Sequence, residues 1–380
     1  MRIALIGPAH PYKGGGARHT TELAHRLASA GHDVVIESWR AQYPGRLYPG
    51  QQTVDVADGE PYPRTCRRLA WYRPDGWLAA GRRITSADLV LFALLTPLQV
   101  PSYLAILAGL GRPPRRPRTA VIAHNVLPHE RRPGDVMLTR ALLAHVDTVI
   151  THSAGQAARA RELAPGATVR TVTMPPHLPA VGRQNYEAER AQVPAPDYPR
   201  ASRPGAPGAR VRLLFFGIVR PYKGLDVLLR ALAGAPAHVT LTVAGEFWRG
   251  TEPTGKLIDE LGLGDRVTLR PGYVPATQIP ALFGAADALV MPYREATASQ
   301  NARLAFAHGV PVITTTAGAL AEAVRDGVDG LTCAPDDDGD LLRALKEISD
   351  PQTVQRLRAG VRVADAEPLW AEYLRVLLAG

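Results

Sequence analysis

Residues 211–231 read VRLLFFGIVRPYKGLDVLLRA, and this stretch decides the fold class of the second half of the chain. The apolar run over 211–217 is typical of a strand buried in a parallel sheet. Residues 224–234 have leucines at helical spacing and end in glycine, which predicts a helix. A strand, a short loop and a helix in succession indicate a parallel sheet with helices on its faces.

The same alternation continues to the end of the chain. We predict further strands over 239–245, within 266–274, over 287–293 and over 310–315, and helices over 278–285, 301–307, 320–325 and 341–348. A helical tail follows, with the apolar residues Trp370, Tyr373, Leu374, Leu377 and Leu378. In open sheets of this kind, ligands bind beyond the carboxyl ends of the strands.

The first half repeats the pattern. We predict strands over 2–7, 33–38, 88–93, 119–123, 148–151 and 169–172, and a first helix over 20–30. Residues 181–209 hold five prolines and no apolar periodicity, so we interpret them as a linker. The prediction is an α/β protein with doubly wound domains over 1–180 and 210–360 that face a cleft. The tail over 361–380 could pack back on the first domain.

Composition excludes several classes of protein. The 380 residues are 46% hydrophobic and 21% charged, which excludes disorder as the main state. Cys66 and Cys333 form no CxxC or zinc spacing, so we expect two reduced thiols in a cytoplasmic protein. The longest apolar window, 89–110, is interrupted by polar residues and prolines, and no signal peptide is evident at the start.

The net positive charge of the chain comes from its first half. Up to residue 209 there are 26 Lys+Arg and 15 Asp+Glu, a net charge of +11, whereas the rest has 18 and 20, a net charge of −2. The asymmetry suggests an anionic partner, such as the inner face of a membrane. Arginine-rich genomic composition explains it equally well. The arginines over 112–118 and the apolar residues 101–110 fit a membrane contact, or a solvated loop after a buried helix.

Two loops have residues suited to phosphate. Arg220 and Lys223 lie between a strand and a helix, where two cations suit a diphosphate, particularly one that becomes a leaving group. Gly14, Gly15 and Gly16 follow the first strand, where glycine lets backbone N–H groups approach a phosphate. The glycine run matches neither the dinucleotide fingerprint nor the P-loop.

Taken together, these segments resemble the family-4 retaining glycosyltransferases. The resemblance covers FFGIVRPYKGLDVLL, VTLTVAGEFW, ADALVMPY and HGVPVITTTAGALAEAVRDGVDGL in the second half, and GPAHPYKGGGARHTTELAHRLASAGHDV, AHNVLPHE and THSAG in the first. It implies the GT-B architecture, in which two Rossmann-like domains bind a nucleotide sugar mostly through the second. It also implies that no metal ion or resident cofactor is needed.

The resemblance assigns roles to individual residues. Arg220 and Lys223 match cations on the donor diphosphate, and His124 matches a histidine that contacts the transferred sugar. Gly15 and Gly16 match the loop whose amides meet the diphosphate, and the backbone of Tyr273 and Val274 matches the stretch that contacts the base. The predicted donor-binding set is Gly15, Gly16, Glu246, Tyr273, Val274, Ser299, Gln300, Asn301 and Glu322.

One motif departs from the family. Members usually have two glutamates eight positions apart, and the corresponding residues here are Ala296 and Leu304. Glu295 is one residue out of register. The segment resembles a subgroup variant with an ATQSG-like run, in which Ser299, Gln300 and Asn301 could offer groups to the donor at a helix N-terminus.

Several hypotheses follow. The first is a retaining transferase that moves a sugar from a nucleoside diphosphate to a glycan, lipid-linked or small-molecule hydroxyl, the leaving phosphate taking the acceptor proton. The others are a nucleotide-sugar epimerase, an inactive partner subunit that has lost the glutamates, and, weakest, a nucleic-acid-binding protein. The run DDDGD at 336–340 could suggest a metal site, but we interpret it as the acidic start of a helix.

Overall fold

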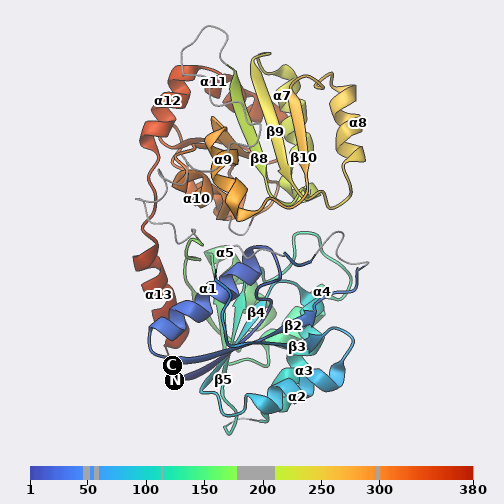
Figure 1. Cartoon of the computed structure of the whole chain (residues 1–380), viewed down its shortest axis with the longest axis vertical. Helices are drawn as coiled ribbons and strands as arrows, with labels where there is room; N and C mark the ends of the chain where they lie inside the picture. Colours follow the sequence, from blue (N-terminus) through green and yellow to red (C-terminus); the bar gives the residue numbers. More distant parts are fainter. Residues whose placement is uncertain (46–51, 55–59, 113, 178–209, 297–299, 380) are drawn as a thin grey trace. The chain divides into compact units, whose positions relative to one another are not determined.

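The computed structural model describes residues 1–45, 52–54, 60–112, 114–177, 210–296 and 300–379. The chain forms two compact units (Figure 1). Unit 1 contains the described residues up to His177 and those from Ala366 onward, and unit 2 contains the described residues between them. The linker predicted over 181–209 lies outside the described residues.

Unit 1 is built on a parallel sheet. In its described part, the strand order is β3-β2-β1-β4-β5-β6-β7, and every pairing is parallel. The strands are β1 (Arg2–Ile6), β2 (Asp33–Ala41), β3 (Thr65–Ala70), β4 (Leu89–Leu94), β5 (Arg118–Ala123), β6 (Thr148–Thr151) and β7 (Thr168–Thr171).

Helices cover both faces of this sheet (Figure 1). One face buries α2 (Pro74–Arg83), α3 (Val100–Leu110), α4 (Asp135–Leu143) and α5 (Ala154–Leu163). The other face packs mainly α1 (Gly15–Ser29) and α13 (Ala366–Leu378). Trp370 and Tyr373 of α13 are fully buried there, so the C-terminal helix is part of the core of unit 1.

The apolar stretch over 101–110 is an ordinary buried helix. In α3, Tyr103 and Ile106 are fully buried in the core. Helix α2 packs against it so closely that a Cβ on Gly81 would lie 2.1 Å from the carbonyl oxygen of Ile106. The apolar residues of this helix are therefore used largely in the core of unit 1. Within the described residues, no helix is both long and apolar enough to span a membrane.

The adjoining arginines differ from the solvated loop that we expected. Arg112 and Arg115 are exposed. Arg116 instead donates to Thr119 Oγ1 at 2.6 Å and to Asp147 at 2.8 Å, and Arg118 contacts the carbonyl of Ala379 at 3.4 Å. Part of the basic run is thus used to hold β5 and the end of the chain.

Unit 2 repeats the architecture with strand order β10-β9-β8-β11-β12-β13, all parallel, in its described part. The strands are β8 (Val211–Phe216), β9 (Val239–Gly245), β10 (Val267–Pro271), β11 (Ala288–Met291), β12 (Val312–Thr315) and β13 (Gly330–Cys333).

Two sets of helices sandwich this second sheet. One core contains α7 (Leu225–Gly234), α8 (Glu252–Glu260), α11 (Asp338–Ile348) and α12 (Pro351–Gly360). The other contains α9 (Ile279–Gly284), α10 (Gln300–Ala307) and the 3-10 helix η5 (Gly318–Ala323). The short 3-10 helices η3 (Pro221–Lys223) and η4 (Ala276–Gln278) lie in connections after strands.

The predicted elements are confirmed with two corrections. The first helix begins at Gly15 rather than at residue 20, so Gly15 and Gly16 lie in its first turn and not in a loop. The helix predicted over 320–325 is a 3-10 helix over Gly318–Ala323. The edge strands β3 and β13 were not predicted, because they are short and carry little periodicity.

Candidate functional site

Arg220 and Lys223 lie in the connection after β8, where the strand order of unit 2 reverses. Strand β8 pairs with β9 on one side and with β11 on the other. The loop after β8 and the segment after β11 therefore meet at the carboxyl ends of two neighbouring strands. This is the position at which open α/β sheets bind ligands.

Lys223 is a buried cation. Its side chain is only 8% exposed, and its Nζ lies 5.1 Å from the centroid of the Tyr293 ring. Burial lowers the pKa of Lys223, and the nearby charge of Arg220 lowers it further. No carboxylate in the described part of the chain is paired with it. A buried ammonium group without a counter-ion is costly, and an anion would lower that cost.

Glycine is required around this lysine. Gly217 has φ of +98°, and a Cβ there would lie 3.3 Å from Lys223 Nζ. Gly245, at the end of β9, approaches so closely that a Cβ would lie 1.9 Å from the carbonyl oxygen of Gly217. The backbone at the ends of the two strands is therefore in direct contact.

Arg220 is held by the loop that follows β9. Its guanidinium carbon lies 4.4 Å from the centroid of the Trp248 ring, a cation–π contact. The backbone N–H of Val219 donates to the carbonyl of Glu246 at 2.8 Å, and that of Trp248 donates to Val219 at 3.2 Å. These two backbone hydrogen bonds join the loop that carries Arg220 to the loop that carries Glu246. The sequence did not predict this contact.

The other predicted donor residues of unit 2 follow strands of the same sheet. Tyr273 and Val274 follow β10 and are half-buried. Asn301, in the first turn of α10, donates its side-chain N–H to the carbonyl of Phe216 at 3.1 Å and to Tyr293 Oη at 3.3 Å. Its amide therefore stabilises the site from within. Gln300 begins α10, and Glu322 is exposed in η5. Ser299 lies outside the described residues.

The glycine loop and His124 belong to unit 1. Gly14 precedes α1 with φ of +92°, and α1 has no acidic residue in its first turn. Its positive N-terminal dipole is thus not offset by a carboxylate of that turn. A Cβ on Gly15 would meet nothing within 4 Å, whereas a Cβ on Gly16 would lie 2.5 Å from Leu95.

His124 lies in a cluster of four histidines that sequence reasoning missed. His19 comes from α1, His124 and His152 directly follow β5 and β6, and His177 follows β7. The ring of His19 lies 5.0 Å from that of His124 and 4.9 Å from that of His177, measured between centroids. Three of the four follow the ends of strands. This shared position is the signal from which the sequence could have predicted the cluster.

Hydrogen bonds connect the cluster to the C-terminal helix. His19 Nδ1 lies 3.1 Å from His177 Nε2, and His19 Nε2 lies 2.9 Å from Tyr373 Oη of α13. Burial lowers the pKa values of His19 and His124 well below the ordinary range, and neighbouring histidines lower them further. His19, His124 and His152 are therefore neutral at neutral pH. The buried Nε2 of His124 has no hydrogen-bond partner among the described residues.

The described residues contain no metal-ligand cluster. No group of three or more His, Cys, Asp or Glu side chains among them could hold a metal ion. The DDDGD run is a helix start, as expected: Asp337 caps α11 by accepting from the backbone N–H of Asp340 at 2.9 Å. Cys66 and Cys333 are both free, and burial raises the pKa of Cys333 to about 12.

Two family models match the chain. The one described as Glycosyltransferase Family 4 matches residues 13–176, and the one described as Glycosyl transferases group 1 matches residues 210–350. The D-inositol 3-phosphate glycosyltransferase 1 of Catenulispora acidiphila is 29% identical over 99% of this chain and 92% of its own length. The glycogen synthase of Mycobacterium tuberculosis is 28% identical over 95% and 89%.

Solved structures share the fold. The sucrose-phosphate synthase of Thermosynechococcus elongatus superposes with a TM-score of 0.74 at 20% identity, covering 98% of this chain and 97% of the other. Anabaena HepE, in complex with UDP and glucose, gives 0.71 at 16% identity, with 99% of each chain covered. The two Rossmann-like units thus have the GT-B fold, and both matching family models describe glycosyltransferases, enzymes that transfer a glycosyl group. The chain belongs to the family-4 glycosyltransferases.

Proposed function

We propose that this enzyme moves a sugar from a nucleoside diphosphate sugar to an acceptor hydroxyl with retention of configuration. One observation carries the proposal: Lys223 is a buried cation without a carboxylate partner, beside Arg220, at the switch point of unit 2. Only an anionic ligand can compensate this charge, and a diphosphate matches two neighbouring cations. HepE was solved in complex with UDP-glucose, which supports a nucleotide sugar as donor.

The proposed chemistry needs no protein nucleophile. The bond between the anomeric carbon and the diphosphate oxygen breaks, the acceptor oxygen bonds to the same face of that carbon, and the acceptor proton goes to the leaving phosphate. Negative charge grows on the diphosphate as the bond breaks. Lys223 and Arg220 stabilise that charge, so they lower the barrier without a metal ion.

The remaining predicted residues bind the donor in this proposal. Backbone amides at Gly15 and Gly16 meet the diphosphate, and His124 meets the transferred sugar through its buried Nε2. The backbone of Tyr273 and Val274 contacts the base. Glu246, Ser299, Gln300, Asn301 and Glu322 complete the set, with the segment at 299–301 taking the place of the family's missing glutamates.

The acceptor is the less constrained partner. The net charge of +11 over the first 209 residues favours an acceptor that carries phosphate or lies at an anionic membrane surface. The relative from Catenulispora, named for inositol 3-phosphate, supports the phosphorylated acceptor. Salt-dependent binding to anionic vesicles would favour the membrane surface instead.

Calorimetry with UDP, GDP, ADP, TDP and CDP in the presence of EDTA tests the proposal. We expect one diphosphate to bind, and at a hundredfold excess over its dissociation constant to stabilise the protein by about 2.7 kcal/mol. Lys223→Ala should abolish this binding, whereas Lys256→Ala, at a lysine whose side chain is 70% exposed, should not change it. If no diphosphate binds, an inactive partner subunit, which the residues Ala296 and Leu304 favour, becomes the better hypothesis.

A further inference from the structure

Arg294 connects the segment after β11 to the turn that carries Lys223. Its backbone N–H donates to the carbonyl of Tyr222 at 2.7 Å, and its Nη1 donates to the carbonyl of Pro221 at 2.8 Å. Both carbonyls belong to η3, which ends at Lys223. A single residue thus holds this turn through two hydrogen bonds, one from its backbone and one from its side chain.

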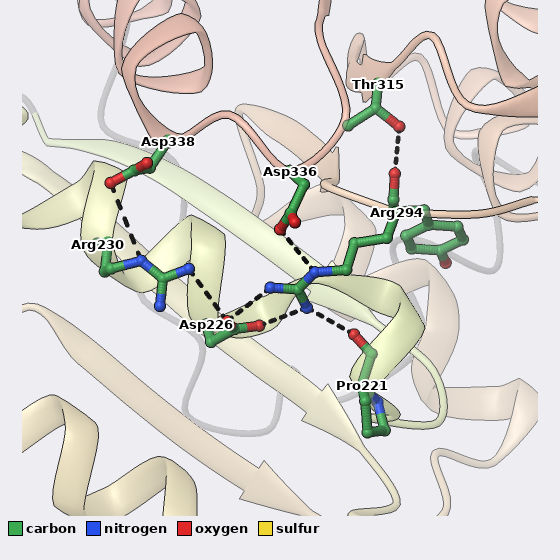
Figure 2. A network of polar contacts seen from close by, with 8 residues as sticks. Pro221, Asp226, Arg230, Arg294, Thr315, Asp336 and Asp338 are labelled. Carbon is green, nitrogen blue, oxygen red and sulfur yellow. Dashed lines mark hydrogen bonds and ion pairs between the residues drawn. The ribbon is translucent and has the colours of Figure 1, made fainter. Parts of the chain in front are cut away.

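The other donors of the guanidinium group are bound by carboxylates (Figure 2). Nη1 and Nη2 donate to the two oxygens of Asp226, in the first turn of α7, at 2.8 and 2.7 Å. Nε donates to Asp336, just before α11, at 2.7 Å. The planar fork is therefore held in one orientation from two sides. These ion pairs raise the pKa of Arg294. Burial raises the pKa of Asp226, but Arg294 and Arg230 together lower it below its ordinary value.

A second layer of contacts holds the carboxylates. Arg230 lies 3.1 Å from the same Asp226 and 3.9 Å from Asp338 of the acidic run (Figure 2). Asp336 has φ of +59°, the left-handed region that residues other than glycine rarely adopt. Strained backbone persists where its surroundings demand it. Here it lies at the residue whose carboxylate meets Arg294.

The turn also packs directly on the segment that contains Arg294. Gly224 has φ of +65°, and a Cβ there would lie 2.0 Å from the carbonyl oxygen of Pro292. Lys223 lies against the ring of Tyr293, and the carbonyl of Tyr293 accepts a hydrogen bond from Thr315 Oγ1 at 2.6 Å. Residues 292–294 are therefore the surface on which the cationic turn rests.

We propose that Arg294 is a positioning residue for the reaction: it holds the turn over 220–224 so that Lys223 stays buried and aimed at the diphosphate. This inference rests on the proposed function. Arg220 and Lys223 carry like charges, so they repel each other. Arg294 opposes this through the two backbone carbonyls, and the site is organised before the donor arrives.

The first test compares kinetics and binding of Arg294→Gln with those of Arg343→Gln. Arg343 is a matched control, because it also lies beside two carboxylates, Asp340 at 2.7 Å and Glu347 at 3.7 Å. It also donates to one carbonyl, that of Thr332, but it does not contact the cationic turn. We expect Arg294→Gln to lower kcat at least tenfold and to weaken binding of the nucleoside diphosphate. Binding of the nucleoside without phosphate should stay unchanged. Arg294→Lys should recover only part of this loss, since one ammonium cannot replace the fork.

The second test reads the lysine directly and needs no turnover. The chain has four lysines, Lys13, Lys223, Lys256 and Lys346, so isotope-labelled lysine side chains can be titrated individually by NMR. In the wild-type protein Lys223 should titrate below the other three. In Arg294→Gln its titration should move up toward theirs, and in Arg343→Gln it should stay low.

The outcomes separate this inference from the proposed function. If Lys223→Ala binds the diphosphate as the wild type does, the proposed function fails. A second outcome would overturn the positioning role alone. In it, Lys223→Ala abolishes diphosphate binding, but in Arg294→Gln kcat stays within twofold of the wild type and Lys223 still titrates below the other lysines. Equal loss of nucleoside and diphosphate binding in Arg294→Gln would also overturn it, because that pattern means general destabilisation of unit 2.

Discussion

Lys223 in unit 2 and the histidine cluster in unit 1 are both buried titratable groups near the carboxyl ends of parallel strands. The protein handles their charge in opposite ways. Burial lowers the pKa values of the histidines, and His19 bonds to His177 and to Tyr373 within the fold. Lys223 is buried beside Arg220 and has no carboxylate partner among the described residues, so its charge is left without compensation by an acidic side chain there. The comparison teaches that burial alone does not mark a ligand site, whereas burial with uncompensated charge does.

Removing the charge of Lys223 is the strongest test of this comparison. Lys223→Met should lower turnover by roughly a hundredfold to a thousandfold, as loss of a group that stabilises transition-state charge does. Without nucleotide the variant should be at least as stable as the wild type, because a buried unpaired cation has been replaced by an apolar side chain. Steady-state kinetics and urea unfolding measure the two effects. Wild-type turnover would remove Lys223 from the site.

The histidine cluster predicts a loss of stability in acid. Burial lowers the pKa of His152 from its ordinary 6.5 to about 4. The unfolded chain therefore binds a proton below pH 6.5, whereas the folded chain resists it until about pH 4. Stability is full above pH 6.5 and falls as the pH drops through this window, by about 3 kcal/mol from this one residue. Urea unfolding between pH 8 and 4 measures the fall.

Two variants separate this effect from general acid denaturation. His152→Gln should flatten the pH dependence between 6.5 and 4, whatever its stability at pH 8. His145→Gln, at an exposed histidine on the same unit, should leave the dependence as in the wild type. If the free energy of unfolding changes with pH equally steeply in both variants, His152 is already protonated in the folded protein between pH 6.5 and 4.

The smallest expected effect concerns the first turn of α1. Gly15 is exposed with open space around its Cβ position, so Gly15→Ala should stabilise the helix by about 0.5–1 kcal/mol. If its amide meets a phosphate, the added methyl group should also weaken nucleotide binding severalfold. Gly155→Ala is the matched control in the first turn of α5, with the same open space. Equal nucleotide affinity in both variants would remove Gly15 from the site.

Most of the fold was predictable because its signals are local. The run VRLLFFG and the helix after Gly224 were identified from periodicity, and the structure has both. The predicted donor residues near the switch point are brought together because each follows a strand of the same sheet. Arg294 was overlooked although it follows β11 directly, because nothing in the local pattern distinguishes a structural arginine from a solvated one.

The sequence by itself determined two doubly wound α/β halves, a cationic turn after β8 and a glycine run after β1, since each depends on neighbouring residues. Only the tertiary structure decided which groups are compensated. Arg294 meets Asp226 across 68 positions, and His19 meets Tyr373 across 354. Whether a buried charge finds a partner depends on contacts between residues distant in the chain, and local periodicity carries no information about such contacts.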